Sequence, residues 1–530
     1  MPGLTMNLTE FEVALGVENV VRSNSASPNL ADATFPTHAI VPAVLRPGTV
    51  AEVQICIRLA ARNQLQIHPI STGKNWGYGS AVPFADSCLL IDLGRLNRIL
   101  EYDDHLGYVV IEPGVTQQQL YDFLQQNGGR FWMDATGSSP SCSIIGNTLE
   151  RGFGHTPFSD HFANSCAYQV VLPSGELIET GLAAMTESAT KNVFRWGVGP
   201  FVDGLFSQSR FGVVTRMTIW LMPAPESFLP FFFKCRYDAA LPRLIEVLRE
   251  ARQSGILQSS VHIVNDYRVL CGMQQYPWEE ANGKTPLSPE LITTFRKRDG
   301  FGAWNGSGAL YGPAPLVKTM QKLLGRLLRP HVNSLHFTSE SLLEFAKKHT
   351  AFLSPLSGIN LKKTLNLIVP SIELLRGRPT SHPMNTVYWR KRIPMPDNPN
   401  PDRDRCGLLW SAPVCPADGP SAVKLSQIVT ETLITGGFEP FLSFTLVSPR
   451  ALIGVISISY DRDLPGEDDK ALATNNLLNE RLMAAGFPPY RLGVQSMQFW
   501  DKHQKLRALS PLEAALDPQS FLSPGHYSLY

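Results

Sequence analysis

The 530-residue sequence lacks both long hydrophobic runs and an excess of charge of one sign. Lysine and arginine total 47 and aspartate and glutamate 46, so the formal net charge is only +1. Binding to nucleic-acid phosphates usually leaves a clear basic excess, so we expect no nucleic-acid partner. No stretch reaches the ~18 apolar residues of a transmembrane helix, so we expect no membrane span.

Cysteine is scarce, and its spacing carries no motif. The eight cysteines contain no C-x-x-C pair, so zinc ribbons and thioredoxin-type motifs have no support, and we expect free thiols and no metal site. The N-terminal segment lacks the basic start and apolar run of a Sec signal peptide. We therefore expect a cytoplasmic protein, with export by another route left open.

The length of 530 residues predicts two or three domains, because ~150 residues is a common domain size. In the first part, short strand-like runs alternate with helical patterns, such as the amphipathic stripe of residues 50–62. A run with three prolines near residue 224 marks a boundary, after which helical and strand-like runs indicate an α+β unit. The proline-rich and charged residues 392–407 are expected to form an exposed loop.

The segment PISTGKNWGYGSA, residues 69–81, is rich in glycine and follows a strand-like run. Such a turn lets backbone N–H groups converge on an anion, because no Cβ obstructs the approach. It is neither a Walker loop nor a Rossmann fingerprint, because it contains no G-K-[ST] and no G-x-G-x-x-G. Taken alone, it is equally consistent with phosphate binding and with an ordinary tight turn.

Further segments resemble one known family when they are taken together and in order. They are STGKNWGYGS, VVIEPGVT, GNTLERGFGHTPFSDHF, WGVGPFVDGLFSQSRFGVVTRM, GFGAWNGSGALYG, PPYRLGVQ and DPQSFLSPG. They resemble the vanillyl-alcohol oxidase and 4-cresol dehydrogenase (hydroxylating) family of FAD enzymes, and most strongly its 4-cresol dehydrogenase flavoprotein branch. The resemblance extends from about residue 40 to residue 526.

The resemblance implies an α+β protein with a two-subdomain, PCMH-type FAD-binding domain and a cap domain that contains an antiparallel sheet. It places the FAD-binding domain at residues 1–224, the substrate-binding cap at 225–492, and a segment that completes the FAD-binding domain at 493–530. The residues that it places along FAD are Thr72, Gly73, Lys74, Asn75, Trp76, Gly77, Gly79, Gly146, Asn147, Gly152, Val213 and Val214. For each glycine, turn geometry is the alternative explanation.

Tyr78, Tyr490 and Arg491 match the three family residues that hold the oxygen of a phenol substrate. A free phenol has a pKa near 10, so a guanidinium and two hydroxyl donors around one oxygen would favour the phenolate. The resemblance then implies hydride transfer from the benzylic carbon of a para-substituted phenol to FAD. The product would be a p-quinone methide that is hydrated or rearranged. The alternatives for these side chains are a domain-interface pair and a packed aromatic.

The family often attaches its flavin covalently. Tyr388 matches the linking tyrosine of the cresol branch if a gap is moved by one position, whereas the oxidases' histidine falls near Leu408. Noncovalent FAD ranks second, and Cys142, where related flavoproteins have a linking cysteine, ranks third.

Several polar positions of the family differ in this sequence. The acid that the oxidases place beside the flavin falls on Ser138, as in the cresol branch, and nearby Asp134 is expected to cap a turn. A Glu, a His and an Asp of the cresol-branch pocket fall on Ser443, Ile453 and Ser457. A pocket relieved of these groups would suit a larger or more apolar 4-substituted phenol.

The electron acceptor is left open. The sequence contains no C-x-x-C-H haem motif, so either a separate cytochrome c, which would favour a periplasmic location, or dioxygen must reoxidise the flavin. The family also implies a homodimer. The alternative functions are an oxygen-using aryl-alcohol or eugenol-type oxidase, oxidation of a non-phenolic alcohol, and a flavin-binding scaffold without catalysis.

Overall fold

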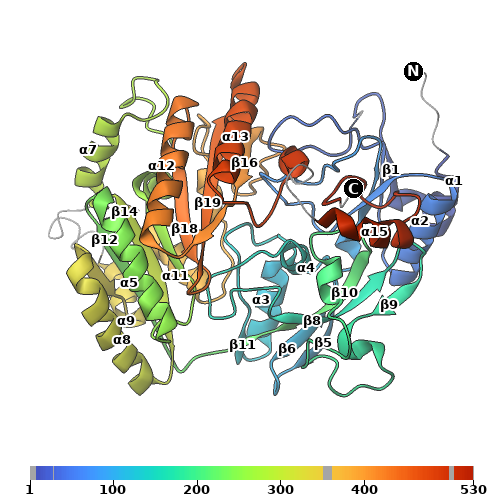
Figure 1. The fold of residues 1–530 in the computed structure, drawn as a ribbon, viewed down its shortest axis with the longest axis horizontal. Helices are drawn as coiled ribbons and strands as arrows, with labels where there is room; N and C mark the ends of the chain where they lie inside the picture. Colours follow the sequence, from blue (N-terminus) through green and yellow to red (C-terminus); the bar gives the residue numbers. More distant parts are fainter. Residues whose placement is uncertain (1–6, 28, 350–360, 500–505, 529–530) are drawn as a thin grey trace.

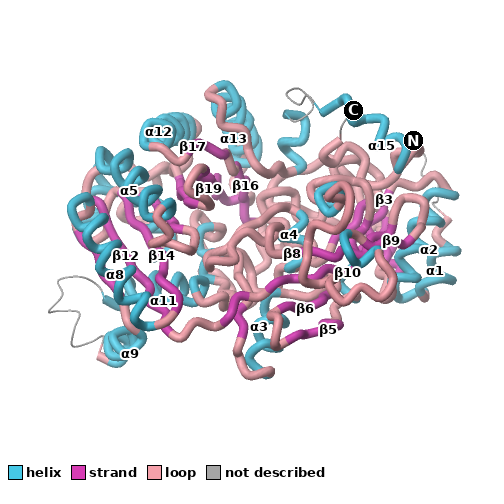
Figure 2. Tube along the Cα trace, turned by 60° about the horizontal axis from the view of Figure 1, so that its bottom comes forward, coloured by secondary structure: helices cyan, strands magenta, loops and turns pink. Residues whose placement is uncertain are grey.

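The computed structural model describes residues 7–27, 29–349, 361–499 and 506–528. Within these residues the strands form sheets of four, five and eight strands and one two-stranded pair. The two smaller sheets lie at one end of the molecule and the eight-stranded sheet at the other (Figure 1). The second view shows that loops fill most of the space between them (Figure 2).

The first sheet is mainly parallel, in the order β1-β2-β4-β3. Its elements are β1 (Val20–Arg22), β2 (Ala43–Leu45), β4 (Leu89–Asp92), β3 (Ile67–Ile70), α1 (Thr9–Leu15) and α2 (Val50–Arg62). The predicted stripe of α2 is confirmed, because it packs into the core of this subdomain through its apolar face. Strand β3 leads directly into the glycine-rich loop, so this sheet positions the loop.

The second sheet is antiparallel, in the order β5-β6-β10-β8-β9. Its strands are β5 (Ile99–Asp103), β6 (Tyr108–Ile111), β10 (Val213–Trp220), β8 (Ser165–Val171) and β9 (Leu177–Glu179). Helices α3 (Gln117–Gln126) and α4 (Ile144–Leu149) accompany it, with the pair β7 (Phe131–Trp132) and β11 (Met222–Pro223).

Thr116 caps the N-terminus of α3 without a full capping box. The Thr116 hydroxyl accepts a hydrogen bond from the Gln119 backbone N–H at 3.2 Å. The Gln119 side chain instead donates to the Asn97 carbonyl at 2.7 Å. The Gln119 side-chain amide is therefore bonded to the loop that contains Asn97 and not to Thr116.

The third sheet is antiparallel throughout, in the order β15-β12-β14-β13-β18-β19-β16, with β17 paired to β19. Its strands are β12 (Ser227–Cys235), β13 (Val261–Asn265), β14 (Trp304–Gly312), β15 (Ser334–Phe337), β16 (Cys406–Ser411), β17 (Val414–Pro416), β18 (Phe441–Leu446) and β19 (Ala451–Asp461). The predicted α+β class and antiparallel sheet are confirmed. The boundary predicted near residue 224 falls between β11 and β12.

Helices cover the outer face of the third sheet, where the largest apolar core lies (Figure 1). They are α5 (Leu241–Gln253), α8 (Ala314–Leu328), α12 (Gly419–Thr435) and α13 (Glu467–Ala484). The remaining helices are α6 (Asp266–Met273), α7 (Pro289–Asp299), α9 (Glu340–Lys348), α11 (Leu361–Leu375) and α15 (Ser510–Leu516). The inner face of the sheet, which turns toward the smaller sheets, carries many of the polar side chains described below.

Short 3-10 helices occur in the connections. They are η1 (Val17–Asn19), η2 (Leu93–Arg95), η3 (Gly181–Ala184), η4 (Asp203–Phe206), η5 (Asp238–Ala240), η6 (Arg329–His331), η7 (His382–Thr386), η8 (Val494–Ser496) and η9 (Leu506–Leu509).

The end of the chain returns to the first sheet. The Ile67 N–H donates to the Phe521 carbonyl at 2.9 Å, and the Ser523 N–H donates to the Ile67 carbonyl at 2.7 Å. Phe521 and Leu522 are buried in the core of that subdomain, and Figure 1 shows the red C-terminal segment beside the blue N-terminal one. The part of segment 493–530 that the structure describes therefore packs against the N-terminal region.

Candidate active site

A cavity of about 760 Å³ lies between the smaller sheets and the inner face of the third sheet. One wall is formed by the glycine-rich loop, α4 and the start of β10, and the facing wall by β13, β16, β18, β19, α6 and α11. Residues from both halves of the chain thus share one enclosed space.

Most residues that were predicted along FAD line this cavity. They are Thr72, Gly73, Lys74, Asn75, Trp76, Gly146, Asn147, Gly152, Val213 and Val214. Gly77 and Gly79 do not line it, because they form the back of the loop.

Both glycines at the back of the loop have a conformation and a packing that exclude a side chain. Gly77 has φ +76°, and a Cβ there would lie 2.1 Å from Cδ1 of Trp410 on β16. Gly79 has φ +122°, and its Cβ would lie 2.7 Å from Cγ2 of Val494. Glycine is therefore required here by the turn and by close packing.

Helix α4 approaches the loop closely, because a Cβ at Gly146 would lie 2.6 Å from the Ser71 Oγ. The turn after α4 packs back on that helix, because a Cβ at Gly152 would lie 2.1 Å from the Asn147 Oδ1. This wall is thus built largely of backbone and small side chains, beside the Lys74 ammonium. Backbone N–H groups and the Lys74 ammonium along this wall fit the pyrophosphate of a bound FAD, because both attract an anion.

The three predicted phenol-binding residues converge on the same cavity, although they come from opposite ends of the sequence. The guanidinium of Arg491 lies over the Tyr78 ring, 4.2 Å from its centroid. It also donates to the side-chain oxygen of Asn75 in the glycine-rich loop, residues 69–81, which is called the cofactor loop below because FAD is expected beside it. The Tyr490 ring lies 5.8 Å from the Phe153 ring, and the Tyr490 N–H donates to the Ala412 carbonyl at 3.1 Å.

Burial determines the protonation of the two tyrosines. It raises the pKa of Tyr78 far above its usual value, and the nearby Tyr490 adds to this effect. Burial also raises the pKa of Tyr490, although the charge of Arg491 opposes the change. Both hydroxyls therefore keep their protons at neutral pH and can donate hydrogen bonds to a ligand oxygen.

Glu150 is a residue of this site that the sequence did not reveal. Its Oε2 lies 3.3 Å from the Arg491 Nε and accepts from the Tyr527 hydroxyl at 3.2 Å. Burial opposes ionisation of Glu150, but His526 and the charge of Arg491 lower its pKa below the usual value. The Arg491 cation is therefore partly neutralised before any ligand binds. Only the position of Glu150 inside the quoted motif GNTLERGFG could have drawn attention to it.

Ser138 and Cys142 line the cavity together. The Ser138 hydroxyl lies 3.1 Å from the Cys142 sulfur, and burial raises the pKa of the Cys142 thiol. Asp134 lies behind them and holds a turn, as predicted, because it accepts from the N–H groups of His155 and Thr156.

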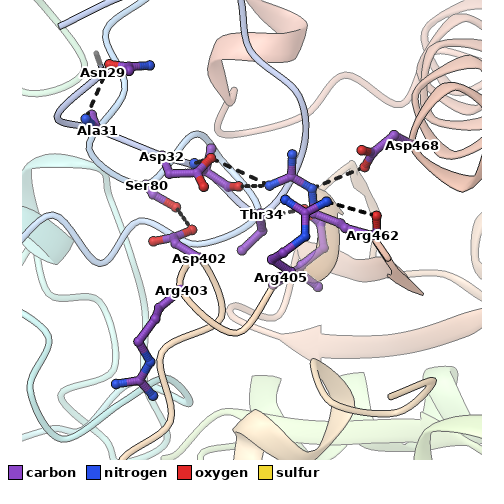
Figure 3. A network of polar contacts seen from close by, with 12 residues as sticks. Asn29, Ala31, Asp32, Thr34, Ser80, Asp402, Arg403, Arg405, Arg462 and Asp468 are labelled. Atoms are coloured by element: carbon purple, nitrogen blue, oxygen red, sulfur yellow. Dashed lines mark hydrogen bonds and ion pairs between the residues drawn. The ribbon is translucent and has the colours of Figure 1, made fainter. Parts of the chain in front are cut away.

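The loop of residues 392–407 is not simply exposed, so that part of the prediction is wrong. The Asp402 carboxylate accepts from the Ser80 hydroxyl at 2.7 Å, as Figure 3 shows, and from the Trp76 indole N–H at 3.0 Å. Burial raises the pKa of Asp402 to about 6. The proline and charge pattern indicates a loop, but it gives no sign that one carboxylate anchors the cofactor loop.

Thr34 joins the cofactor loop to the third sheet. Its hydroxyl donates to the Leu408 carbonyl on β16 at 2.8 Å and accepts from the Gly77 N–H at 3.0 Å. Nearby in Figure 3, Arg462 pairs with Asp468 at 3.2 Å and with Asp32 at 3.6 Å. This network fixes the glycine-rich loop against the sheet that forms the facing wall.

The facing wall differs from the family pocket at the positions noted in the sequence. Ser443 lines the cavity, whereas Ile453 and Ser457 are buried outside it. Arg268 on α6 also lines the cavity, and no sequence pattern pointed to it.

Comparisons with known proteins agree with this arrangement. Residues 41–181 match the model of an FAD binding domain. The chain is 38% identical to 1'-carboxy-chondrochloren decarboxylase of Chondromyces crocatus, over 98% of this chain and 96% of that protein. It is 30% identical to the 4-cresol dehydrogenase [hydroxylating] flavoprotein subunit of Pseudomonas putida, over 97% and 94%. The chain belongs to this family of FAD-dependent oxidoreductases.

A solved structure confirms the family fold. The 4-ethylphenol oxidase of Gulosibacter chungangensis, in its isoeugenol complex, superposes with a TM-score of 0.87 at 26% identity, over 99% of this chain and 96% of that one. The protein is therefore a PCMH-type flavoprotein with an FAD-binding part and a cap, and its cofactor is FAD. No helix in the described ranges is long and apolar enough to cross a membrane.

In this flavoprotein, the two candidate sites of covalent attachment differ in position. Tyr388 is fully buried, and its hydroxyl donates to the Asp404 carboxylate at 2.5 Å. It does not line the cavity, although Met384 and Val387 beside it do. Cys142 lines the cavity.

Proposed function

We propose that this FAD-dependent oxidoreductase removes a hydride from the benzylic carbon of a para-substituted phenol. The observation that carries the proposal is the convergence of Tyr78, Tyr490 and Arg491 on a cavity whose wall is also the cofactor loop. Tyr78 lies directly between Gly77 and Gly79 of that loop. A phenol oxygen held by these three groups would therefore lie close to the cofactor.

The three side chains have separate tasks. The hydroxyls of Tyr78 and Tyr490 stay protonated, so both donate hydrogen bonds to the phenol oxygen. Arg491 supplies a guanidinium that stays charged, held in place by Asn75 and Glu150. Together these donors favour the phenolate, whose negative charge makes loss of hydride at the para position easier.

FAD, when bound, accepts the hydride together with the electron pair of the benzylic C–H bond. The substrate is left as a p-quinone methide, with its oxygen still held by Tyr78, Tyr490 and Arg491. Addition of water to the benzylic carbon returns the ring to a phenol and gives the hydroxylated product. Ser443 on the facing wall can position a water molecule but cannot act as a carboxylate base.

Loss of carbon dioxide is a second candidate fate of the same intermediate. It requires a carboxylate on the carbon next to the benzylic carbon. The electron pair of the bond to the carboxylate then forms a new C=C bond, the ring returns to phenolate, and CO₂ leaves. The 38% identical relative is named as a decarboxylase of a carboxylated compound, and Arg268 places a positive charge on the facing wall.

The electron acceptor is either a separate cytochrome c or dioxygen. One relative is a flavoprotein subunit and the compared structure is an oxidase, so the family supports both. Stopped-flow mixing of the reduced protein with air decides: rapid reoxidation identifies an oxidase, whereas slow reoxidation supports a cytochrome partner and a periplasmic location. A homodimer is also proposed, and light scattering of the holoenzyme tests it.

We also propose that FAD is attached covalently through Tyr388, which matches the linking tyrosine of the cresol branch. Its hydroxyl donates to the Asp404 carboxylate and does not line the cavity, so attachment requires the ring to turn toward the cavity, which Met384 and Val387 beside it already line. Acid precipitation tests the link, because attached flavin stays with the protein pellet. A Tyr388→Phe variant should release the colour and Cys142→Ser should retain it; the reverse pattern would identify the cysteine.

Product analysis tests the proposed reaction. The oxidised holoenzyme is mixed anaerobically with 4-ethylphenol, 4-propylphenol and 3-(4-hydroxyphenyl)propanoate, and the products are separated by chromatography. A benzylic alcohol, an alkenylphenol or CO₂ with 4-vinylphenol each indicates a quinone methide intermediate. A product oxidised at any other carbon would contradict the proposal.

A further inference from the structure

Arg268 is a cation on the wall of the cavity that has no carboxylate partner in the described part of the chain. It lies in the first turn of α6, where its backbone N–H donates to the side-chain oxygen of the N-cap residue Asn265 at 3.1 Å. Burial lowers its pKa, and the nearby Cys271 opposes this change. Buried or cavity-facing cations usually have an anionic partner, so the missing partner requires an explanation.

The contacts of the guanidinium hold it in place without neutralising it. Its carbon lies 5.3 Å from the centroid of the Trp410 ring and 5.4 Å from that of Phe441. Its Nη2 donates to the Val455 carbonyl at 3.3 Å, and its Nε has no hydrogen-bond partner in the ranges described. The Nε is covered by protein, so the Nη1 group, which makes no hydrogen bond within the described residues, is the donor left for a ligand.

Arg268 lies on the other side of the Trp410 ring from Tyr78. The Trp410 ring packs against Gly77, next to Tyr78, and the Arg268 guanidinium lies over the same ring. Val455, which accepts from Arg268, pairs directly with Ser443 across β18 and β19. Arg268 therefore lies beside Ser443, one of the positions where the family pocket has a different polar residue.

The charges on the cavity walls favour an anionic ligand. Among the residues that the structure describes, the walls carry Lys74, Lys234, Arg268 and Arg491 but only two carboxylates, Glu150 and Asp299. Glu150 pairs with Arg491, and Asp299 pairs with Arg298. Lys74 lies in the cofactor loop, where FAD supplies phosphate charge, whereas Arg268 lies on the opposite wall.

We propose that Arg268 binds a carboxylate carried by the para side chain of the substrate. This inference rests on the proposed function, because it places the phenol oxygen at Tyr78 and Arg491. A planar guanidinium with free donors matches a carboxylate in charge and geometry. The substrate class is therefore a 4-substituted phenol with an acidic side chain.

Two phenols of matched length test the proposal. 3-(4-Hydroxyphenyl)propanoate and 4-propylphenol differ in the group at the end of the side chain, which is a carboxylate in one and a methyl in the other. The ratio of kred/Kd for the acid to that for 4-propylphenol is measured by anaerobic flavin bleaching. In Arg268→Gln we expect this ratio to fall about 100-fold, since truncating one partner of a buried charge pair has effects of that size. Arg268→Lys should recover part of it.

A control variant removes a cation outside the cavity. Arg481 pairs with the exposed Glu431 at 2.7 Å and does not line the cavity. Arg481→Gln should leave the ratio unchanged. Calorimetric titration with 3-(4-methoxyphenyl)propanoate, which cannot form a phenolate, measures carboxylate binding without turnover and should show weaker binding in Arg268→Gln.

The outcomes separate this inference from the proposed function. If neither phenol bleaches the wild-type flavin, the proposed function fails, whereas bleaching by the acid alone supports both proposals. If both phenols bleach it, but the ratio is the same in wild type, Arg268→Lys and Arg268→Gln, Arg268 has only a structural role and the inference is overturned. Should Arg268→Gln fail to fold, an unchanged ratio and unchanged calorimetric affinity in Arg268→Lys would overturn it equally, because lysine cannot reproduce bidentate binding.

Discussion

The guanidinium of Arg491 lies 4.2 Å from the centroid of the Tyr78 ring, which joins the last part of the chain to the cofactor loop. This contact places a charge and a hydroxyl donor at one point of the cavity wall.

We expect Arg491→Ala to lower kcat/KM for a 4-alkylphenol by at least 100-fold, the usual effect of removing one donor to a developing oxyanion. The measurement is steady-state kinetics, with the FAD content determined from absorbance. Arg481→Ala is the matched control, because Arg481 pairs with the exposed Glu431 outside the cavity. Equal kcat/KM in wild type and Arg491→Ala would refute the role of this arginine.

Glu150 should oppose phenolate formation, because it offsets the charge of Arg491. We expect Glu150→Gln to lower the pKa of a bound phenol by about one unit or more, since a charge within 4–6 Å has effects of this size. The measurement is the ultraviolet absorbance of bound phenolate as a function of pH. Glu431→Gln, at an exposed position, is the control. A bound-phenol pKa that rises in Glu150→Gln would show that Glu150 mainly orients Arg491.

Gly77→Ala tests the close packing behind the cofactor loop. The substitution adds a Cβ at φ +76° and 2.1 Å from the Trp410 ring. Positive φ costs about 1–2 kcal/mol for an L-residue and overpacking about 1–3 kcal/mol more. We expect lower unfolding free energy and lower FAD content. Gly199→Ala, at φ +85° with open space around it, should show the backbone cost alone, and equal losses in both variants would contradict the packing argument.

Asp402 predicts a specific pH dependence of stability. Its pKa in the folded protein is about 6, above the usual value near 3.9, so ionisation weakens the folded state at pH above 6. This penalty is largely lost as the pH falls from 6 to 4, because the folded-state carboxyl is then protonated and the unfolded-state carboxyl begins to be. Asp402→Asn should therefore be more stable than wild type at pH 8, by about 3 kcal/mol at most, and lose most of this gain at pH 4.

Chemical denaturation of the protein at pH 8 and pH 4 measures this difference. Asp397→Asn is the control, because Asp397 is exposed on the same loop. A stability difference between Asp402→Asn and wild type that is the same at both pH values would contradict the assigned pKa.

Local features were predictable from the sequence because they depend on neighbouring residues. The stripe of α2 and the glycine-rich loop after β3 belong to this class. Tyr78, Tyr490 and Arg491 were found through their motifs, but only the fold shows them side by side.

Features that depend on distant pairing were not predictable. Thr34 joins Gly77 to Leu408 across hundreds of residues, and neither segment signals the other. Asp402 looked exposed because its own neighbours are proline and charge, whereas Trp76 and Ser80 donate hydrogen bonds to it in the fold. Arg268 lies in an ordinary helix, and only the cavity makes its missing partner visible.

The central claim is that the site recognises a phenol oxygen, and a phenol and its methyl ether test it most directly. The oxidised holoenzyme is mixed anaerobically with 4-ethylphenol or with 4-ethylanisole, and the flavin absorbance is followed. We expect rapid bleaching by the phenol and none by the ether, which cannot become a phenolate. Bleaching by both at similar rates, or by neither, would contradict the account.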